Sequence, residues 1–199
     1  MRGYKEPRIR VSVVLLILIL FIGGSALGAY IETGIDDTAR NGALQYIDSV
    51  LKEDPAQGGG TAVFKDSLKN NGILLLAMTV GGVTVILFPA ALAVITYKGM
   101  ALGFTSALIM EGASGNGVLE CCAALLPQNL VLIPLFGIYG YFTFCMAMSV
   151  IRCRNKRYRG RIYADNLKVY LMITVPAAIF LCITAAVEGF INPLLSGII

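Results

Sequence analysis

The stretch VSVVLLILILFIGGSALGAY, residues 11–30, decides the class of fold. It carries no charge, and about 20 residues at 1.5 Å rise cross a hydrocarbon core of about 30 Å. The apolar core of a cleaved leader is shorter, so we expect this helix to remain as a membrane anchor. Within it, Gly24 and Gly28 form a small-xxx-small pattern, which lets a second helix approach closely.

The composition extends this conclusion to the whole chain. Of its 199 residues, 57% are hydrophobic and 14% are charged, and the mean hydropathy is +0.76. This leaves too little polar surface for a water-soluble globule, and predicts an all-α, polytopic transmembrane bundle. There is no histidine, and the five cysteines lack the spacing of a metal site. We therefore expect no metal, no cofactor and no enzymatic activity.

One long polar region, residues 31–71, carries seven acids and four bases. Apolar residues at helical spacing predict an amphipathic helix from Asp37 to Lys52, with Asp37 or Thr38 able to cap its start. Pro55 and the glycines that follow it end the pattern. We expect a second, shorter helix over residues 61–70.

Further apolar stretches predict four more spans. Residues 73–97 form the second, kinked at Pro89, and Lys98-Gly99 then closes a tight turn. Residues 100–128 are two short apolar halves around a polar centre, which indicates a broken third span. A re-entrant hairpin is the alternative for that segment. Residues 130–151 and 167–186 are the fourth and fifth spans.

Basic residues set the expected orientation. Residues 1–10 carry four bases against one acid, and residues 152–161 carry six cations and no acid. Such segments face the cytoplasm, so topology explains the basic loop without a nucleic-acid partner. The prediction is five spans, one of them broken, N-in and C-out. Its boundaries are a cytoplasmic N-terminus (1–10), span one (11–30), an extracytoplasmic segment (31–71), and a bundle of four further spans (72–199).

Several polar side chains fall at or near membrane depth and form a candidate site: Glu111, Glu120, Gln128, Asn129, Glu188 and Asn192. An ionised carboxylate there costs several kcal/mol unless it is paired or neutral. The alternative is that Glu111 and Glu188 lie at the interface, while Gln128 and Asn129 satisfy backbone groups freed by Pro127.

Three motifs carry a resemblance: TYKGMALG at 96–103, LLPQNLVLIP at 125–134 and VEGFINP at 187–193. In order and spacing, over essentially the whole length, the chain resembles the stage II sporulation protein M family. Wider relatives have Leu-Pro-His-Gly followed by an acid; here Gln128, Asn129 and Ile133 stand instead, as in the sporulation branch. The candidate structural or interaction residues are Lys98, Gly99, Gly103, Glu120, Pro127, Gln128, Asn129, Pro134, Glu188, Asn192 and Pro193.

The resemblance implies a role in engulfment, when the mother-cell membrane migrates around the forespore. It implies a membrane scaffold at the septal and engulfing membrane that localises two peptidoglycan-degrading partners, stage II sporulation proteins D and P. Self-association into a homo-oligomer is left open. An alternative from the residues themselves is a transporter or permease component, in which the broken third span with Glu120, Gln128 and Asn129 surrounds a substrate path.

Overall fold

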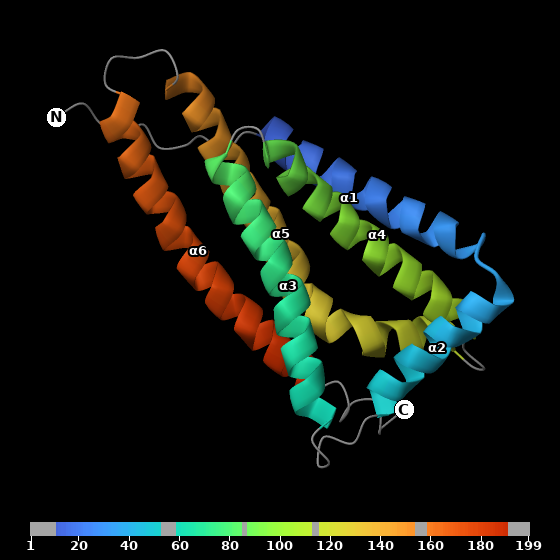
Figure 1. Cartoon of the computed structure of the whole chain (residues 1–199). Helices are drawn as coiled ribbons and strands as arrows, with labels where there is room; N and C mark the ends of the chain where they lie inside the picture. Colours follow the sequence, from blue (N-terminus) through green and yellow to red (C-terminus); the bar gives the residue numbers. More distant parts are fainter. Residues whose placement is uncertain (1–10, 53–58, 85–86, 113–115, 154–158, 191–199) are drawn as a thin grey trace.

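The computed structural model describes residues 11–52, 59–84, 87–112, 116–153 and 159–190, and their regular structure is helical. The α-helices are α1 (Val11–Glu32), α2 (Asp37–Lys52), α3 (Gly59–Val83), α4 (Phe88–Gly112), α5 (Gly117–Cys153) and α6 (Arg159–Phe190). Figure 1 shows the long helices running lengthwise, with α2 at one end of the bundle. The predicted all-α class is confirmed, as is the helix over Asp37–Lys52.

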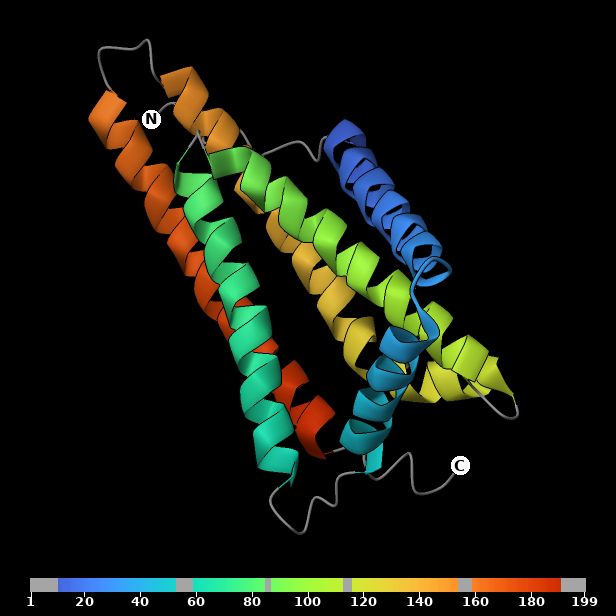
Figure 2. The same ribbon diagram turned by 45° about the vertical axis from the view of Figure 1, so that its right-hand side comes forward.

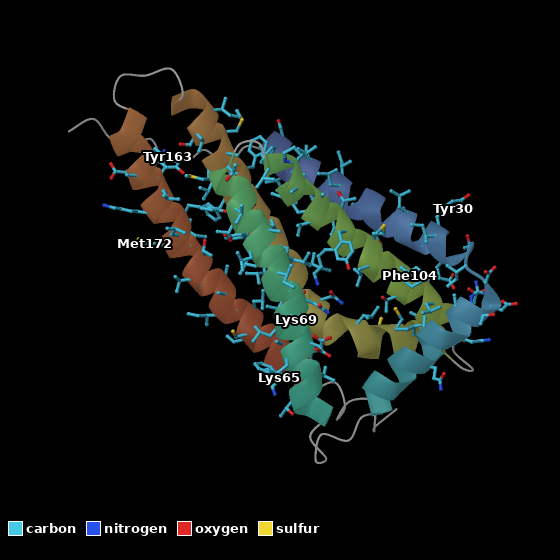
Figure 3. All side chains as sticks on the ribbon, in the orientation of Figure 1. Tyr30, Lys65, Lys69, Phe104, Tyr163 and Met172 are labelled. Atoms are coloured by element: carbon cyan, nitrogen blue, oxygen red, sulfur yellow. The ribbon has the colours of Figure 1, made fainter. Side chains whose placement is uncertain are left out.

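Four segments of the described chain are long and apolar enough to cross a bilayer: Val11–Glu32, Phe88–Gly112, Asn129–Ile151 and Tyr163–Gly189. Their outward faces carry apolar side chains, such as Met172 on α6, which is 74% exposed (Figure 3). Lipid tails suit such a surface, whereas water does not. Helix α3 lies beside these segments but begins with a polar half that includes Lys65 and Lys69 (Figure 3).

Helices α1 and α4 form a tightly packed pair, side by side in Figures 1 and 2. A methyl group at Gly28 would lie 2.0 Å from the Met100 carbonyl oxygen, and one at Gly103 would lie 1.9 Å from that of Ser25. Gly24 and Gly99 meet the facing backbone in the same way. The small-xxx-small prediction for Gly24 and Gly28 is therefore confirmed, and α4 supplies a matching pair. The order of these contacts makes the two helices parallel.

Helices α3, α5 and α6 form a second group, held by buried hydroxyl groups. The Tyr139 hydroxyl on α5 is hydrogen-bonded to Thr79 of α3 at 2.7 Å and to Thr174 of α6 at 2.9 Å. The Tyr170 hydroxyl on α6 is hydrogen-bonded to Thr143 of α5 at 3.0 Å, and it donates to the Met78 carbonyl of α3 at 3.2 Å. In an apolar medium such bonds between helices stabilise the bundle.

The turn between α3 and α4 corrects the predicted second span. Residues 73–97 are not one helix, because α3 ends at Val83 and α4 begins at Phe88. Thr84 N still donates to Val80 O at 2.9 Å, and Leu87 N donates to Thr84 O at 3.0 Å. Proline fits the first helical turn, where its missing N–H is not needed, so Pro89 begins a helix and does not kink one.

Residues 100–128 also differ from the prediction, because they do not form one broken span. Residues 100–112 complete α4, so Lys98-Gly99 lies inside that helix and not in a turn. Residues 117–128 begin α5, a helix of 37 residues that changes direction part-way along (Figure 1). Pro127 and Pro134 both lie within α5, and proline is the usual cause of such a bend.

Candidate functional site

A lysine lies near the middle of α4. Helix α4 has 25 residues, and Lys98 is roughly 15 Å from its start at 1.5 Å rise per residue. An ammonium group at such a depth in a spanning helix is costly unless the protein provides polar partners. Lys98 is half-buried, and its surroundings show how the charge is accommodated.

Three neighbouring helices supply those surroundings. The Lys98 ammonium donates a hydrogen bond to the Asn71 side-chain oxygen on α3. Asn71 is 3% exposed, and its Nδ2 donates to Ser67 Oγ at 3.2 Å. The ammonium nitrogen lies 5.5 Å from the centroid of the Phe136 ring on α5, within the range of a cation–π contact. Glu188 of α6 is close enough to interact with it electrostatically. We call these five residues the Lys98 cluster: Lys98, Asn71, Ser67, Phe136 and Glu188. The cluster joins four helices.

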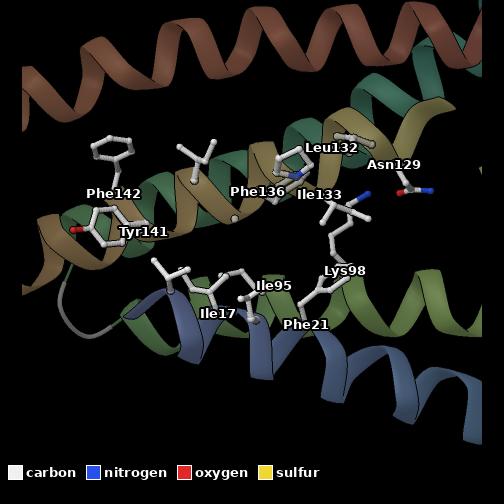
Figure 4. Close-up of a pocket in the computed structure, with 15 residues that line it drawn as sticks. Ile17, Phe21, Ile95, Lys98, Asn129, Leu132, Ile133, Phe136, Tyr141 and Phe142 are labelled. Carbon is white, nitrogen blue, oxygen red and sulfur yellow. The ribbon is translucent and has the colours of Figure 1, made fainter. Parts of the chain in front are cut away.

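A cavity of about 420 Å³ adjoins the Lys98 cluster. It lies between α5 on one side and α1 and α4 on the other (Figure 4). Tyr141 and Phe142 lie at one end, and Asn129 lies at the other, with Lys98 nearby (Figure 4). The remaining lining is apolar: Val14, Ile17, Leu18, Phe21, Ile95, Leu132, Ile133, Pro134, Phe136, Gly137 and Ile138. We call this cavity the apolar groove.

The structure brings only some of the predicted site residues together. Lys98, Asn129 and Pro134 line the apolar groove, and Glu188 is near Lys98. Gly99 and Gly103 instead pack α4 against α1. The side chains of Glu120, Pro127 and Gln128, and the whole of Asn192 and Pro193, lie outside the described part of the structure.

Asn129 has a local structural role. Its Nδ2 donates to the Leu125 carbonyl oxygen at 2.8 Å, one turn earlier in the same helix. The carbonyl that Pro127 leaves without its usual donor is that of Ala123, four residues earlier, so this bond does not test the backbone role expected of Asn129. The contact also turns the polar end of Asn129 toward its own helix.

Glu111 takes part in an ion pair at the end of the bundle. Arg40 of α2 lies 3.3 Å from Glu111 at the end of α4, and its Nε donates to Glu32 at the end of α1 at 3.1 Å. Glu32 is only 1% exposed. Leu44, one turn after Arg40, packs against Gly112. These contacts hold α2 against the ends of α1 and α4.

Sequence reasoning missed two of these features. The ion pairs of Arg40 join residues from three helices, and nothing local marks them. The buried hydroxyl groups do have a signal, because Tyr139 and Tyr170 are each followed four residues later by threonine. Thr143 and Thr174 donate to the carbonyl oxygens of those tyrosines at 2.9 and 3.0 Å.

The described residues offer no ready metal centre. Within the ranges placed by the structure, no three His, Cys, Asp or Glu side chains are grouped to hold an ion. Cys121, Cys122, Cys145 and Cys182 carry free thiols. Burial, together with the neighbouring Cys122, raises the pKa of the Cys121 thiol, which favours its neutral form.

Comparison with known proteins identifies one family. The family model described as stage II sporulation protein M matches residues 14–193. That range includes all of α2 to α6 and nearly all of α1, so the match covers both helix groups and α2. No curated protein and no solved structure matches the chain.

Proposed function

Because the chain belongs to the stage II sporulation protein M family, a family of multi-helix membrane proteins with a role in sporulation, we propose that it is a non-enzymatic membrane scaffold. In this proposal it acts during engulfment, at the septal and engulfing membrane of the mother cell. It recruits peptidoglycan-degrading partners, stage II sporulation proteins D and P, to the outer face of that membrane. The family match along most of the chain is the observation that carries the proposal.

The position of α2 supports a docking role. Arg40 and Leu44 face the bundle, whereas Asp37, Asn41 and Gln45 are exposed. The three exposed residues recur every four positions, so they share one face of the helix. A folded helix held by ion pairs offers a partner a surface that needs little ordering on binding.

Helix directions support the orientation that the proposal needs. In Figure 1, α1, α4 and α6 begin, and α3 and α5 end, at the same end of the bundle. The basic segments 1–10 and 152–161 adjoin these helix ends in sequence. With that end in the cytoplasm, the proposed arrangement is five crossings, including α3, and α2 lies on the wall side of the membrane.

A surface variant of α2 tests the scaffold. We expect the triple variant Asp37→Arg, Asn41→Arg and Gln45→Arg to stay in the membrane and at the septum, while fluorescent fusions of proteins D and P lose their septal foci. Three arginines on the docking face add repulsion and bulk without removing the contacts of Arg40 or Leu44.

Lys65→Ala with Lys69→Ala is the matched control, since these two exposed residues lie on α3. Membrane-fraction immunoblots establish that each variant is inserted. Foci of both partners that survive in the inserted α2 variant would show that α2 does not recruit them.

The transporter alternative loses its main argument. It depended on a broken span at residues 100–128, but these residues belong to two longer helices. Asn129, one of its three polar residues, bonds to its own helix. No described contact favours a substrate path over the scaffold.

A further inference from the structure

The apolar groove is open along one side of the bundle. Several of its lining residues are strongly exposed, including Ile138 at 60%, Leu18 at 48% and Val14 at 37%. Ile138 and Gly137 lie within the candidate span of α5, and Leu18 within that of α1. The groove therefore faces the region that lipid tails occupy if these helices span the membrane.

Three residues with polar side-chain atoms line the groove, Lys98, Asn129 and Tyr141, and the first two have polar partners within the protein. The Lys98 ammonium bonds to Asn71, so the methylene stem of Lys98 is free to line the wall. The Asn129 amide donates within α5. What remains for an occupant is a mostly apolar surface.

The dimensions of the groove select among apolar occupants. On α5 its lining runs from Asn129 to Phe142, about 20 Å at 1.5 Å per residue. A volume of about 420 Å³ spread over that length gives a mean cross-section of roughly 20 Å². A hydrocarbon chain one carbon wide, whose neighbours lie about 4.5 Å away, needs a cross-section of roughly 20 Å². An α-helix about 10 Å across needs roughly 80 Å². The volume of the groove therefore suits one hydrocarbon chain and is too small to enclose a helix.

One end of the groove lies toward the helix ends that the basic segments adjoin in sequence. Val14 follows the start of α1 by one turn, and Tyr141 and Phe142 lie in the half of α5 nearer its end. In sequence, Arg8 and Arg10 directly precede α1, and six cations between residues 152 and 161 overlap or follow the end of α5. Basic residues at a membrane surface attract anionic headgroups.

We propose that the apolar groove holds one acyl chain of an anionic phospholipid, with its headgroup at the end where α1 begins and α5 ends. The chain passes Tyr141 and Phe142 and extends along Ile138 and Gly137 toward Asn129. Gly137 widens the groove, because a methyl group there would meet no atom within 4 Å. This lipid site is distinct from the α2 surface proposed to recruit partners.

The absence of tryptophan from the chain permits a direct test. Ile138→Trp places a single fluorophore in the groove, and Met172→Trp places one on the exposed outer face of α6. Each full-length variant is reconstituted into vesicles that contain increasing fractions of brominated phosphatidylglycerol or of brominated phosphatidylcholine. Bromine on an acyl chain quenches a tryptophan that it contacts.

We expect the fraction of brominated phosphatidylglycerol that half-quenches Ile138→Trp to be about fivefold lower than the corresponding fraction of brominated phosphatidylcholine. A ratio of that size corresponds to the attraction of roughly one basic residue at the membrane surface. Met172→Trp should show no preference. Adding Gly137→Leu should remove the preference at Ile138→Trp, whereas Gly23→Leu should not, because Gly23 also has open space but lies outside the groove.

Two results would overturn the lipid site. Equal quenching of Ile138→Trp by the two lipids would mean that the groove holds only bulk lipid. Quenching of Met172→Trp but not of Ile138→Trp would mean that protein fills or closes the groove. Since the vesicles contain no partner protein, neither result depends on the scaffold proposal.

Discussion

Lys98 is accommodated by contacts that differ in kind. Its ammonium group has a hydrogen bond to Asn71, an aromatic face at Phe136 and a carboxylate, Glu188, close enough for electrostatic attraction. Each of these contacts stabilises the charged form of Lys98 where water is excluded. Because they come from α3, α5 and α6, the same contacts that accommodate the charge also fix the position of α4.

Lys98→Met should destabilise the protein by leaving polar partners behind. Asn71 is buried and would lose a charged donor, and Glu188 would lose a nearby positive charge. Breaking a fully buried pair costs about 3–5 kcal/mol; since Lys98 is only half-buried, we expect a loss of about 1–3 kcal/mol. The measurement is thermal unfolding in detergent, with the exposed Lys168→Met as the control.

A double-variant cycle then separates the charge pair from the hydrogen bond. Glu188→Gln in the Lys98→Met background should cost less than Glu188→Gln alone, because the carboxylate has already lost its partner. Strictly additive losses would show that Lys98 and Glu188 do not interact.

At the scale of elements, two pairs of glycines determine how α1 and α4 meet. With no side chain at Gly24, Gly28, Gly99 or Gly103, each helix backbone lies against the other. Membrane helices lack a hydrophobic driving force for association, so this close packing supplies much of their attraction. The contact is therefore sensitive to a single methyl group.

Gly103→Ala and Gly23→Ala should have opposite effects. Alanine is favoured over glycine in a helix by about 0.5–1 kcal/mol, so Gly23→Ala, which meets open space, should stabilise the protein slightly. Gly103→Ala forces the backbones apart at Ser25 and should cost about 1–3 kcal/mol. Thermal midpoints in detergent compare the two; equal shifts would contradict this account of the interface.

Helix α2 depends on two ion pairs of unequal strength. The side chain of Glu32 is 2% exposed and that of Glu111 is 53% exposed. We expect Glu32→Gln to weaken the attachment of α2 by about 1–3 kcal/mol, and Glu111→Gln by about 0–1 kcal/mol. Hydrogen exchange of peptides within residues 37–52 measures the difference. Faster exchange in Glu111→Gln than in Glu32→Gln would reverse the assignment of the main contact.

At the scale of the whole molecule, the helices form two groups that share one buried apolar core. One is the α1–α4 pair, and the other is α3, α5 and α6. The α3–α4 turn and the Lys98 cluster connect them, and the Ile95 side chain packs against Gly140. The apolar groove lies where α1 and α5 do not meet closely.

The proposed orientation predicts which loops a membrane-impermeant thiol reagent reaches. In a variant with its own cysteines replaced, Lys156→Cys should be protected in intact protoplasts and labelled after lysis, because the basic loop faces the cytoplasm. Asn41→Cys on the exposed face of α2 should be labelled in both states. Labelling of Lys156→Cys in intact protoplasts would invert the arrangement and place α2 in the cytoplasm.

The sequence by itself determined the helical class, the apolar stretches, the bounds of α2 and the small-residue contact on α1. Each of these depends on local properties: hydropathy over about 20 residues, capping residues, or a repeat of four. The glycines of α1 show that a helix can approach closely there. They do not show that α4 is the partner.

Only the tertiary structure decided where α3 ends, that α5 continues through Pro127, and which residues meet Lys98. Pro89 is compatible with a kink and with a helix start, and the choice depends on how α3 and α4 pack afterwards. The partners of Lys98, Tyr139 and Arg40 lie far away in sequence, on other helices. No local pattern specifies such pairs, because their free energy is gained only when the helices come together.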